Sequence, residues 1–201
     1  LDLVIPSQFF DATKRRVSSF FGDGIVAHVG MADPVCPALA DALEKAARAS
    51  GASVHRGGTY ICIEGPQFST KAESRIYRGW GVDVIGMTNM PEAKLAREAE
   101  LCYATVALVT DYDVWHESHD AVTVEAVIQT LLRNVATAKD VLRRVIPAVD
   151  ATRTCPCPDL LRNAVITQPA AFPLPTRRRL DLFLGKYFPL STKKPKKTRR
   201  G

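Results

Sequence analysis

The chain has 201 residues, of which 46% are hydrophobic, 24% charged and 7% aromatic, with a formal net charge of +6. This composition excludes a disordered or fibrous protein and allows one α/β domain of ordinary size or two small ones. No apolar run reaches the roughly 18 residues that a membrane helix needs, and no signal-peptide pattern opens the chain.

Patterns typical of strands recur along the first 150 residues. They are apolar runs, rich in β-branched residues, at positions 3–10, 54–63, 82–86 and 103–110. Gly57 and Gly58 interrupt the second run, and the fourth run is the strongest candidate for an interior strand.

Helix signals lie between and after these runs. They predict helices over residues 35–50, 70–80 and 91–100, a long helix from about 123, and a short helix over 177–187. Asp33 and Pro34 suit an N-cap and first turn, Gly51 suits a helix end, and Thr70 with Glu73 forms a capping-box pattern. The long helix carries an apolar face made of Val124, Val127, Ile128, Leu131, Leu132 and Val135.

Alternating strands and helices predict an α/β domain with a mixed, largely parallel central sheet flanked by helices. This domain is expected over residues 1–150, and residues 151–188 form a Pro-rich C-terminal region with weaker patterns. Residues 189–201 carry six basic side chains and no acidic one, so the rest of the chain is neutral. The prediction is a disordered basic tail whose only nucleic-acid contacts would be non-specific.

The five cysteines are an odd number and lie mostly in apolar strings: Cys36, Cys62, Cys102, Cys155 and Cys157. This usage predicts reduced, buried thiols in a cytoplasmic protein and not a disulfide framework. Cys155 and Cys157 are too closely spaced for an ordinary zinc pair, and no second pair follows them. No metal site is therefore predicted, and two loop thiols are favoured over a strained disulfide.

Three segments place polar residues directly after predicted strands, at positions 64–70, 86–91 and 110–115. Ligands bind beyond the carboxyl ends of strands in open α/β sheets, so these segments are candidates for a site. Asp111 and Asp113 would point to the same side of an extended backbone; the alternative is that they cap a helix or pair with basic residues. Phe68 could stack on a planar ligand or belong to the core.

Several longer motifs occur together and in a fixed order. They are Asp2-Leu-Val-Ile-Pro6, Glu64-Gly-Pro-Gln-Phe-Ser69, Ala72-Glu-Ser74, Gly86-Met-Thr88, Pro91-Glu-Ala-Lys-Leu-Ala-Arg-Glu-Ala99 and Thr110-Asp-Tyr-Asp113. With these motifs, residues 2–147 closely resemble the methylthioadenosine phosphorylase branch of the purine nucleoside phosphorylase superfamily. The resemblance implies a single-domain phosphorylase/hydrolase-like fold that lacks its N-terminal portion.

The resemblance also implies an activity. The family cleaves 5′-methylthioadenosine with inorganic phosphate, giving adenine and 5-methylthioribose 1-phosphate, without a metal or organic cofactor. It implies a cytoplasmic homotrimer that serves purine and methionine salvage, with 5′-methylthioadenosine or adenosine as substrate and no membrane partner.

Five positions would bind the base, ribose and phosphate by this resemblance. Phe68 would stack on the purine, Met87 would hold the ribose hydroxyls, and Thr88 would contribute to phosphate binding. Asp111 and Asp113 would face the N7 and N6 edge of the purine.

The remaining matched positions concern the 5′ group and substrate preference. Ser69 and Val124 correspond to positions associated with preference, and Val127 and Ile128 would line the methylthio pocket. His28 matches a histidine that reaches the site of the neighbouring subunit in the trimer.

The chemistry of the leaving base agrees with these roles. Negative charge develops on the purine as it leaves, and a carboxyl group at N7 can supply or stabilise the neutralising proton, so Asp111 is assigned as catalytic. A 6-oxopurine would leave the partners of an N6 amine unpaired, which favours 6-aminopurines. A purine nucleoside phosphorylase of broader specificity remains the nearest alternative.

The sequence departs from the family at its N-terminal side. No Gly-rich phosphate loop is found, and the chain begins at Leu1 within a strand pattern. The expectation is either a part of a longer phosphorylase or an inactive remnant that binds only nucleoside or partner subunits.

Overall fold

The computed structural model describes residues 2–114, 124–150, 152 and 154–190, and in the long helix it describes side chains from Ile128 onward. The strands are β1 (Asp2–Ile5), β2 (Gln8–Ala12), β3 (Ser53–Arg56), β4 (Thr59–Ile63), β5 (Val84–Gly86) and β6 (Ala107–Leu108). The α-helices are α1 (Pro37–Ala49), α2 (Lys71–Gly79), α3 (Asn89–Glu98), α4 (Val124–Val145), α5 (Leu174–Arg179) and α6 (Asp181–Leu184). Short 3₁₀ helices are η1 (Ile146–Ala148), η2 (Cys157–Asp159) and η3 (Pro169–Ala171).

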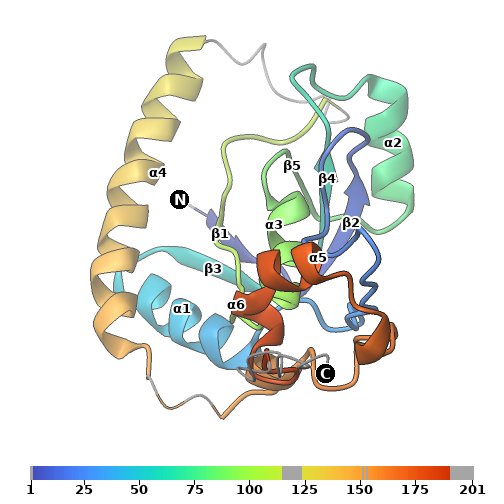
Figure 1. The fold of residues 1–201 in the computed structure, drawn as a ribbon. Helices are drawn as coiled ribbons and strands as arrows, with labels where there is room; N and C mark the ends of the chain where they lie inside the picture. The colour runs from blue at the N-terminus through green and yellow to red at the C-terminus, as the bar shows by residue number, and fades with distance from the viewer. Residues whose placement is uncertain (1, 115–123, 151, 153, 191–201) are drawn as a thin grey trace, which may run out of the picture.

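The strands form two three-stranded sheets, in the orders β3-β1-β6 and β2-β4-β5. Among the residues that the structure describes, three of the four strand pairs are parallel, and the pair of β1 with β6 is antiparallel. The predicted α/β class with mixed, largely parallel pairing is thus confirmed, but two sheets take the place of one. Figure 1 shows α4 along one side of the molecule, with α1 against its C-terminal half, and α2 on the opposite side.

Two chain segments pass from the first sheet into the second at the same level. Residues 2–12 bend between β1 and β2, and residues 53–63 bend between β3 and β4 at Gly57 and Gly58. Both glycines have positive φ, of 95° and 87°, which side chains with a Cβ rarely adopt. The backbone N–H groups of Ser7 and Gln8 both donate to the Gly58 carbonyl, at 3.0 and 3.2 Å, so the two bends lie side by side. The run at 3–10, predicted as one strand, therefore forms two strands, β1 and β2, with the bend between them.

Three clusters of buried side chains hold the elements together. The largest packs Leu3, Ile5 and Val54 of the first sheet against α1 and against Val141 and Val145 of α4. A second lies between the second sheet and α3 and contains Tyr60, Cys62, Met90 and Ala93. A third joins Ile25 to Leu180 and Leu184 and is surrounded by phenylalanines. Among these, the rings of Phe20 and Phe183 stack with their centroids 4.7 Å apart. The third cluster packs the C-terminal helices onto the loop that precedes α1.

The predicted helix ends agree with the structure in most places. Thr70 and Glu73 form the predicted capping box at the start of α2, and Gly51 follows α1 with a φ of +80°. The predicted start of α1 at Asp33 and Pro34 is wrong. The helix begins at Pro37 because Cys36 is extended, with its N–H bonded to the Tyr103 carbonyl at 2.8 Å.

The run at 103–110 forms only a two-residue strand, β6, and its prediction as a long interior strand is wrong. Its apolar character has another cause. Ala104, Val106 and Leu108 pack against the first cluster, while Tyr103 and Ala107 pack against the second. The segment is extended and apolar on both sides because it runs between two cores, not because it pairs along its length.

The long predicted helix is present as α4, and the predicted short helix is present as α5 and α6, which begin three residues earlier. The expected apolar face of α4 is not buried throughout. Ile128, Leu131, Leu132 and Val135 are exposed, whereas Val141 and Val145 are buried against α1. Among the described residues, no helix is long and apolar enough to cross a membrane. Residues 191–201, most of the predicted basic tail, lie outside the described residues.

Gly86 provides a test of the packing between β4 and β5. A Cβ at this position would overlap the hydroxyl of Tyr60, whose side chain is buried in the second cluster. We expect Gly86→Ala to lower the free energy of unfolding by about 1–3 kcal/mol, measured by urea denaturation.

Gly79→Ala is the matched control, because a Cβ there meets nothing within 4 Å. It lies in the last turn of α2 and should be neutral or stabilising by up to about 1 kcal/mol. Equal stabilities of the two variants would contradict the predicted overlap.

Candidate active site

The predicted site lies where the strands of the second sheet end. β2, β4 and β5 are mutually parallel neighbours, so their carboxyl ends meet at one edge. Figure 1 shows the three strands side by side, with α2 on one flank. The segments that follow are the loop after Ala12, residues 64–70, and residues 87–88 before α3. This edge is where open α/β sheets bind ligands.

Arg16 links these three segments. Its guanidinium comes from the loop after β2 and donates to the carbonyls of Met87 at 2.6 Å and Glu64 at 2.9 Å, and also to the carbonyl of Met90. Its Nε lies 3.3 Å from the Glu64 carboxylate. A planar guanidinium can serve several acceptors at once, so a single side chain fixes how the strand-end loops lie relative to one another.

The Glu64 carboxylate also binds the loop after β2 through its backbone. It accepts the backbone N–H of Lys14 at 2.5 Å and that of Arg15 at 3.3 Å. The Lys14 N–H and the Arg16 guanidinium hold the pKa of Glu64 below its ordinary value, against the effect of partial burial. Glu64, the first residue of the predicted Glu-Gly-Pro-Gln-Phe-Ser motif, therefore anchors the loop.

Asp11 fixes the start of the loop after β2 to α3. One of its oxygens accepts the N–H and hydroxyl of Thr13, at 2.9 and 2.6 Å, and the other forms an ion pair with Lys94. Burial raises the pKa of Asp11, but the bonds from Lys94 and Thr13 outweigh it and lower the pKa overall.

Met87 and Thr88 lie at the end of β5. Met87 is half-buried, and its sulfur would be 2.7 Å from a Cβ placed on Gly65, so these two loops are in contact. Thr88 is exposed and hydrogen-bonds to Tyr60, whose pKa is raised chiefly by burial and lowered in part by Thr88. The two residues predicted to contact ribose and phosphate are therefore neighbours of the 64–70 loop.

Phe68 is 87% exposed. The alternative in which it is a core phenylalanine behind a turn is wrong, because a side chain this exposed packs in no buried cluster. Ser69 beside it is half-buried and lies against Tyr77 of α2.

The two predicted carboxylates differ in their surroundings. Asp113 is half-buried and accepts the hydroxyl of Ser74, a buried residue of α2, and the N–H of Val114 at 2.8 Å. Asp111 is exposed, and the hydroxyl of Thr110 donates to it at 2.8 Å. The Ser74 contact brings the segment that carries both carboxylates against α2, which itself follows the 64–70 loop.

The remaining predicted residues are less closely tied to this edge. Val124 and Val127 belong to α4, but their side chains lie outside the described residues, and Ile128 is 48% exposed. His28 is exposed, and its N–H donates to the Ala164 carbonyl at 2.8 Å. Its predicted role concerns a neighbouring subunit and stays a prediction.

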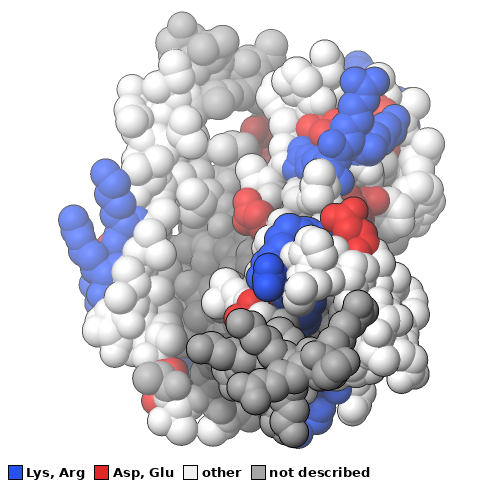
Figure 2. Space-filling model, in the orientation of Figure 1, with Lys and Arg blue, Asp and Glu red and all other residues white. Residues whose placement is uncertain are grey.

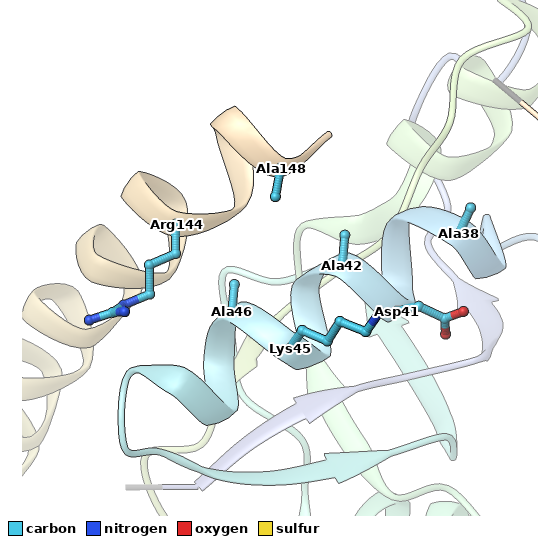
Figure 3. A pocket seen from close by; sticks show the side chains of 7 residues that line it. All are labelled: Ala38, Asp41, Ala42, Lys45, Ala46, Arg144 and Ala148. Atoms are coloured by element: carbon cyan, nitrogen blue, oxygen red, sulfur yellow. The ribbon is translucent and has the colours of Figure 1, made fainter. Parts of the chain in front are cut away.

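A hollow in the surface lies elsewhere, between α1 and α4. Figure 3 shows it lined by Ala38, Asp41, Ala42, Lys45, Ala46, Arg144 and Ala148. None of the predicted site residues lines it. In the view of Figure 2, Lys and Arg are interspersed with Asp and Glu, and no continuous basic face is visible on the body.

Sequence reasoning missed Arg16. Its hydrogen-bond partners lie 46 to 74 positions away along the chain, so no local pattern identifies them. The one signal available is an arginine in the loop that follows a strand of a parallel sheet.

Comparison with known proteins shows the family to which the chain belongs. The phosphorylase superfamily matches residues 1–147, a range that contains all the predicted site residues. The chain belongs to this superfamily. A relative from Geobacter sulfurreducens, named S-methyl-5′-thioadenosine phosphorylase, is 58% identical over 186 residues, which are 92% of this chain and 65% of the relative.

Solved structures of the superfamily have the same fold. A methylthioadenosine phosphorylase from an Antarctic soil metagenomic library aligns with a TM-score of 0.86 at 48% identity, covering 92% of this chain and 66% of the other. A Schistosoma mansoni methylthioadenosine phosphorylase in complex with adenine aligns with a TM-score of 0.75 at 33% identity, covering 82% and 66%. The chain thus spans about two thirds of the length of the relatives that it matches.

The Arg16 link can be tested by Arg16→Lys. A lysine ammonium cannot reach the two carbonyls and the Glu64 carboxylate together, so the loops at 64–70 and 87–90 should open more often. We expect faster hydrogen exchange of their backbone N–H groups, measured by mass spectrometry, and a lower midpoint of thermal unfolding.

Arg15→Lys is the control, because the neighbouring residue takes part through its backbone N–H. It should leave exchange unchanged at both loops. Equal exchange in the two variants would show that the Arg16 side chain does not hold the loops.

Proposed function

We propose that this chain carries the purine-binding part of an enzyme that cleaves 5′-methylthioadenosine with inorganic phosphate. The products are adenine and 5-methylthioribose 1-phosphate. The observation that carries the proposal is Phe68, a largely exposed aromatic residue on a loop fixed over the strand ends by Arg16. Exposing a large aromatic ring to water is unfavourable, and a stacked purine would cover it. The name of the Geobacter relative and the adenine bound to the Schistosoma protein support this substrate class.

In the proposed reaction, a phosphate oxygen attacks C1′ of the ribose as the bond from C1′ to N9 of the purine breaks. The bonding electron pair passes to the purine, where a proton at N7 neutralises the developing charge. Asp111 is assigned to that proton, as its donor or as the carboxylate that stabilises it. Its exposure leaves the carboxyl group accessible to a bound base.

Asp113 is proposed to accept a hydrogen bond from the N6 amine. The bonds from Ser74 and Val114 hold this carboxylate in place, and each carboxylate oxygen can accept a second bond. A 6-oxopurine would place an acceptor against this carboxylate, so we expect adenosine-type substrates to be favoured over inosine.

The other assignments follow the family resemblance. Met87 would contact the ribose hydroxyls, and Thr88 would help bind the phosphate co-substrate. Ser69 and Val124 would influence substrate preference, and Val127 and Ile128 would line the apolar pocket of the 5′-methylthio group. We further infer a cytoplasmic homotrimer in which the exposed His28 reaches the neighbouring site.

The activity is tested by adenine release from 5′-methylthioadenosine, with and without phosphate. The assay uses this chain and the product of the uninterrupted reading frame that contains it. We expect phosphate-dependent release from the longer product. Release that does not depend on phosphate would indicate a hydrolase, and faster turnover of inosine would overturn the proposed role of the carboxylates.

Asp111→Asn tests the role of Asp111 in protonating N7 of the purine. We expect the rate of adenine release to fall by about 100-fold or more, and the ratio of inosine to methylthioadenosine cleavage to rise. Asp41→Asn, on the exposed face of α1, is the matched control and should keep the original rate. An equal loss of rate in both variants would contradict the catalytic role assigned to Asp111.

A further inference from the structure

Four of the five cysteines meet in one place. The Sγ atoms of Cys36, Cys102, Cys155 and Cys157 all lie within 4.8 Å of one another. The Sγ atoms of Cys102 and Cys155 are 3.4 Å apart and form a hydrogen bond. The fifth cysteine, Cys62, is buried in β4 and belongs to the second cluster. The four thiols that meet, those of Cys36, Cys102, Cys155 and Cys157, take no part in the proposed phosphorolysis.

The four cysteines come from three distant parts of the chain. Cys36 is the N-cap residue of α1, Cys102 follows α3, and Cys155 and Cys157 flank a proline at the start of η2. Cys36 and Cys157 are buried, at 1% and 2% exposure, and the other two are half-buried. The group is therefore closed to most of the solvent.

Contacts outside the group hold these three parts together. The N–H of Cys36 donates to the Tyr103 carbonyl at 2.8 Å, which places Cys36 beside Cys102. Glu100 accepts the N–H of Leu161 at 2.9 Å and the hydroxyl of Tyr187 at 2.5 Å. The thiols are thus brought together by a scaffold that does not depend on bonds between the sulfurs.

The spacing of the sulfurs suits a tetrahedral metal ion. Zinc bound by four thiolates has Zn–S distances of about 2.3 Å, which separates the sulfurs by about 3.8 Å. Sulfurs that already lie within 4.8 Å of one another need only small side-chain rotations to reach that geometry. A disulfide would require two sulfurs to approach to about 2.05 Å.

The position of Cys36 suits a metal-bound thiolate. A thiolate at Cys36 would lie at the positive end of the α1 dipole. Several thiolates this close together would repel one another, so a cation between them would hold them in the deprotonated form.

We propose that Cys36, Cys102, Cys155 and Cys157 bind one Zn²⁺ ion in a closed, structural site. Four protein thiolates leave no open position for substrate, so the ion would stabilise the fold and not act in catalysis. Binding replaces the thiol protons, which pass to solvent, and no electrons are transferred. The ion would join the segment that contains η2 to the first turn of α1 and to the end of α3.

The experiment uses the full chain, purified under reducing conditions and reconstituted with Zn²⁺. Zinc per chain is measured by mass spectrometry of the metal, and X-ray absorption reports the ligands. We expect one zinc per chain with four sulfur ligands at about 2.3 Å. Replacement by Co²⁺ should give the intense visible bands of a tetrahedral thiolate site.

Variants separate the cluster from an ordinary buried thiol. We expect Cys155→Ala and Cys102→Ala, both at half-buried positions, to lose zinc, whereas Cys62→Ala should keep one zinc per chain. A chelator should lower the midpoint of thermal unfolding for the original chain and for Cys62→Ala, but not for the two ligand variants. If the variants fail to fold, the metal content and the sulfur ligands of the unsubstituted chain still test the proposal.

Four results would overturn the proposal. One is a chain that stays free of zinc after reconstitution and shows five reactive thiols when unfolded. Another is a disulfide within the group as the resting state in the purified chain. The third is zinc that is bound through oxygen or nitrogen, and the fourth is zinc that is retained by Cys155→Ala.

Discussion

The guanidinium of Arg16 is the contact on which the arrangement of the candidate site depends. Parallel pairing places the carboxyl ends of β2, β4 and β5 at one edge, but pairing alone does not fix the loops that follow. Arg16 joins all three, through the carbonyls of Glu64 and Met87 and the Glu64 carboxylate. Met87 and Gly65, which are in contact, lie on two of the loops that Arg16 joins, and the exposed Phe68 lies on one of them.

The two carboxylates near this edge are positioned by different means. Asp113 is restrained by Ser74, a buried side chain of α2, whereas Asp111 is exposed beside Thr110. A carboxylate held by a helix suits a fixed hydrogen-bonding role, and an exposed carboxylate suits an exchange of protons with a ligand. The same short segment can therefore supply both functions to a purine, because its two acidic residues differ in their neighbours and not in their chemistry.

The C-terminal segment packs onto the α/β body although the superfamily match ends at residue 147. Leu180 and Leu184 fill a cluster with Ile25, and Arg177 is buried while it pairs with Asp181 at 2.7 Å. Glu100 and the four cysteines form a second attachment around residues 155–161, and Glu100 also accepts the hydroxyl of Tyr187 beside the first attachment. Two separate anchors, one apolar and one polar, fix this segment, and the proposed zinc ion would strengthen the second.

The sequence by itself determined the local features of this protein. The capping box at Thr70 and Glu73, the helix end at Gly51 and the alternation of strands with helices depend on residues within a few positions of one another, so they are readable in one dimension. The ordered motifs also predicted the superfamily. The placement of the site residues relative to a bound purine stays a prediction.

Only the tertiary structure decided the features that depend on distant residues. The division into two sheets, the exposure of Phe68, the Arg16 link and the meeting of four cysteines all join positions that lie tens of residues apart. The run at 103–110 shows the physical reason most clearly. The apolar pattern rightly predicted that this run is extended and packed against the core. Whether such a run pairs as a strand or lies between two cores is decided by what packs on either side.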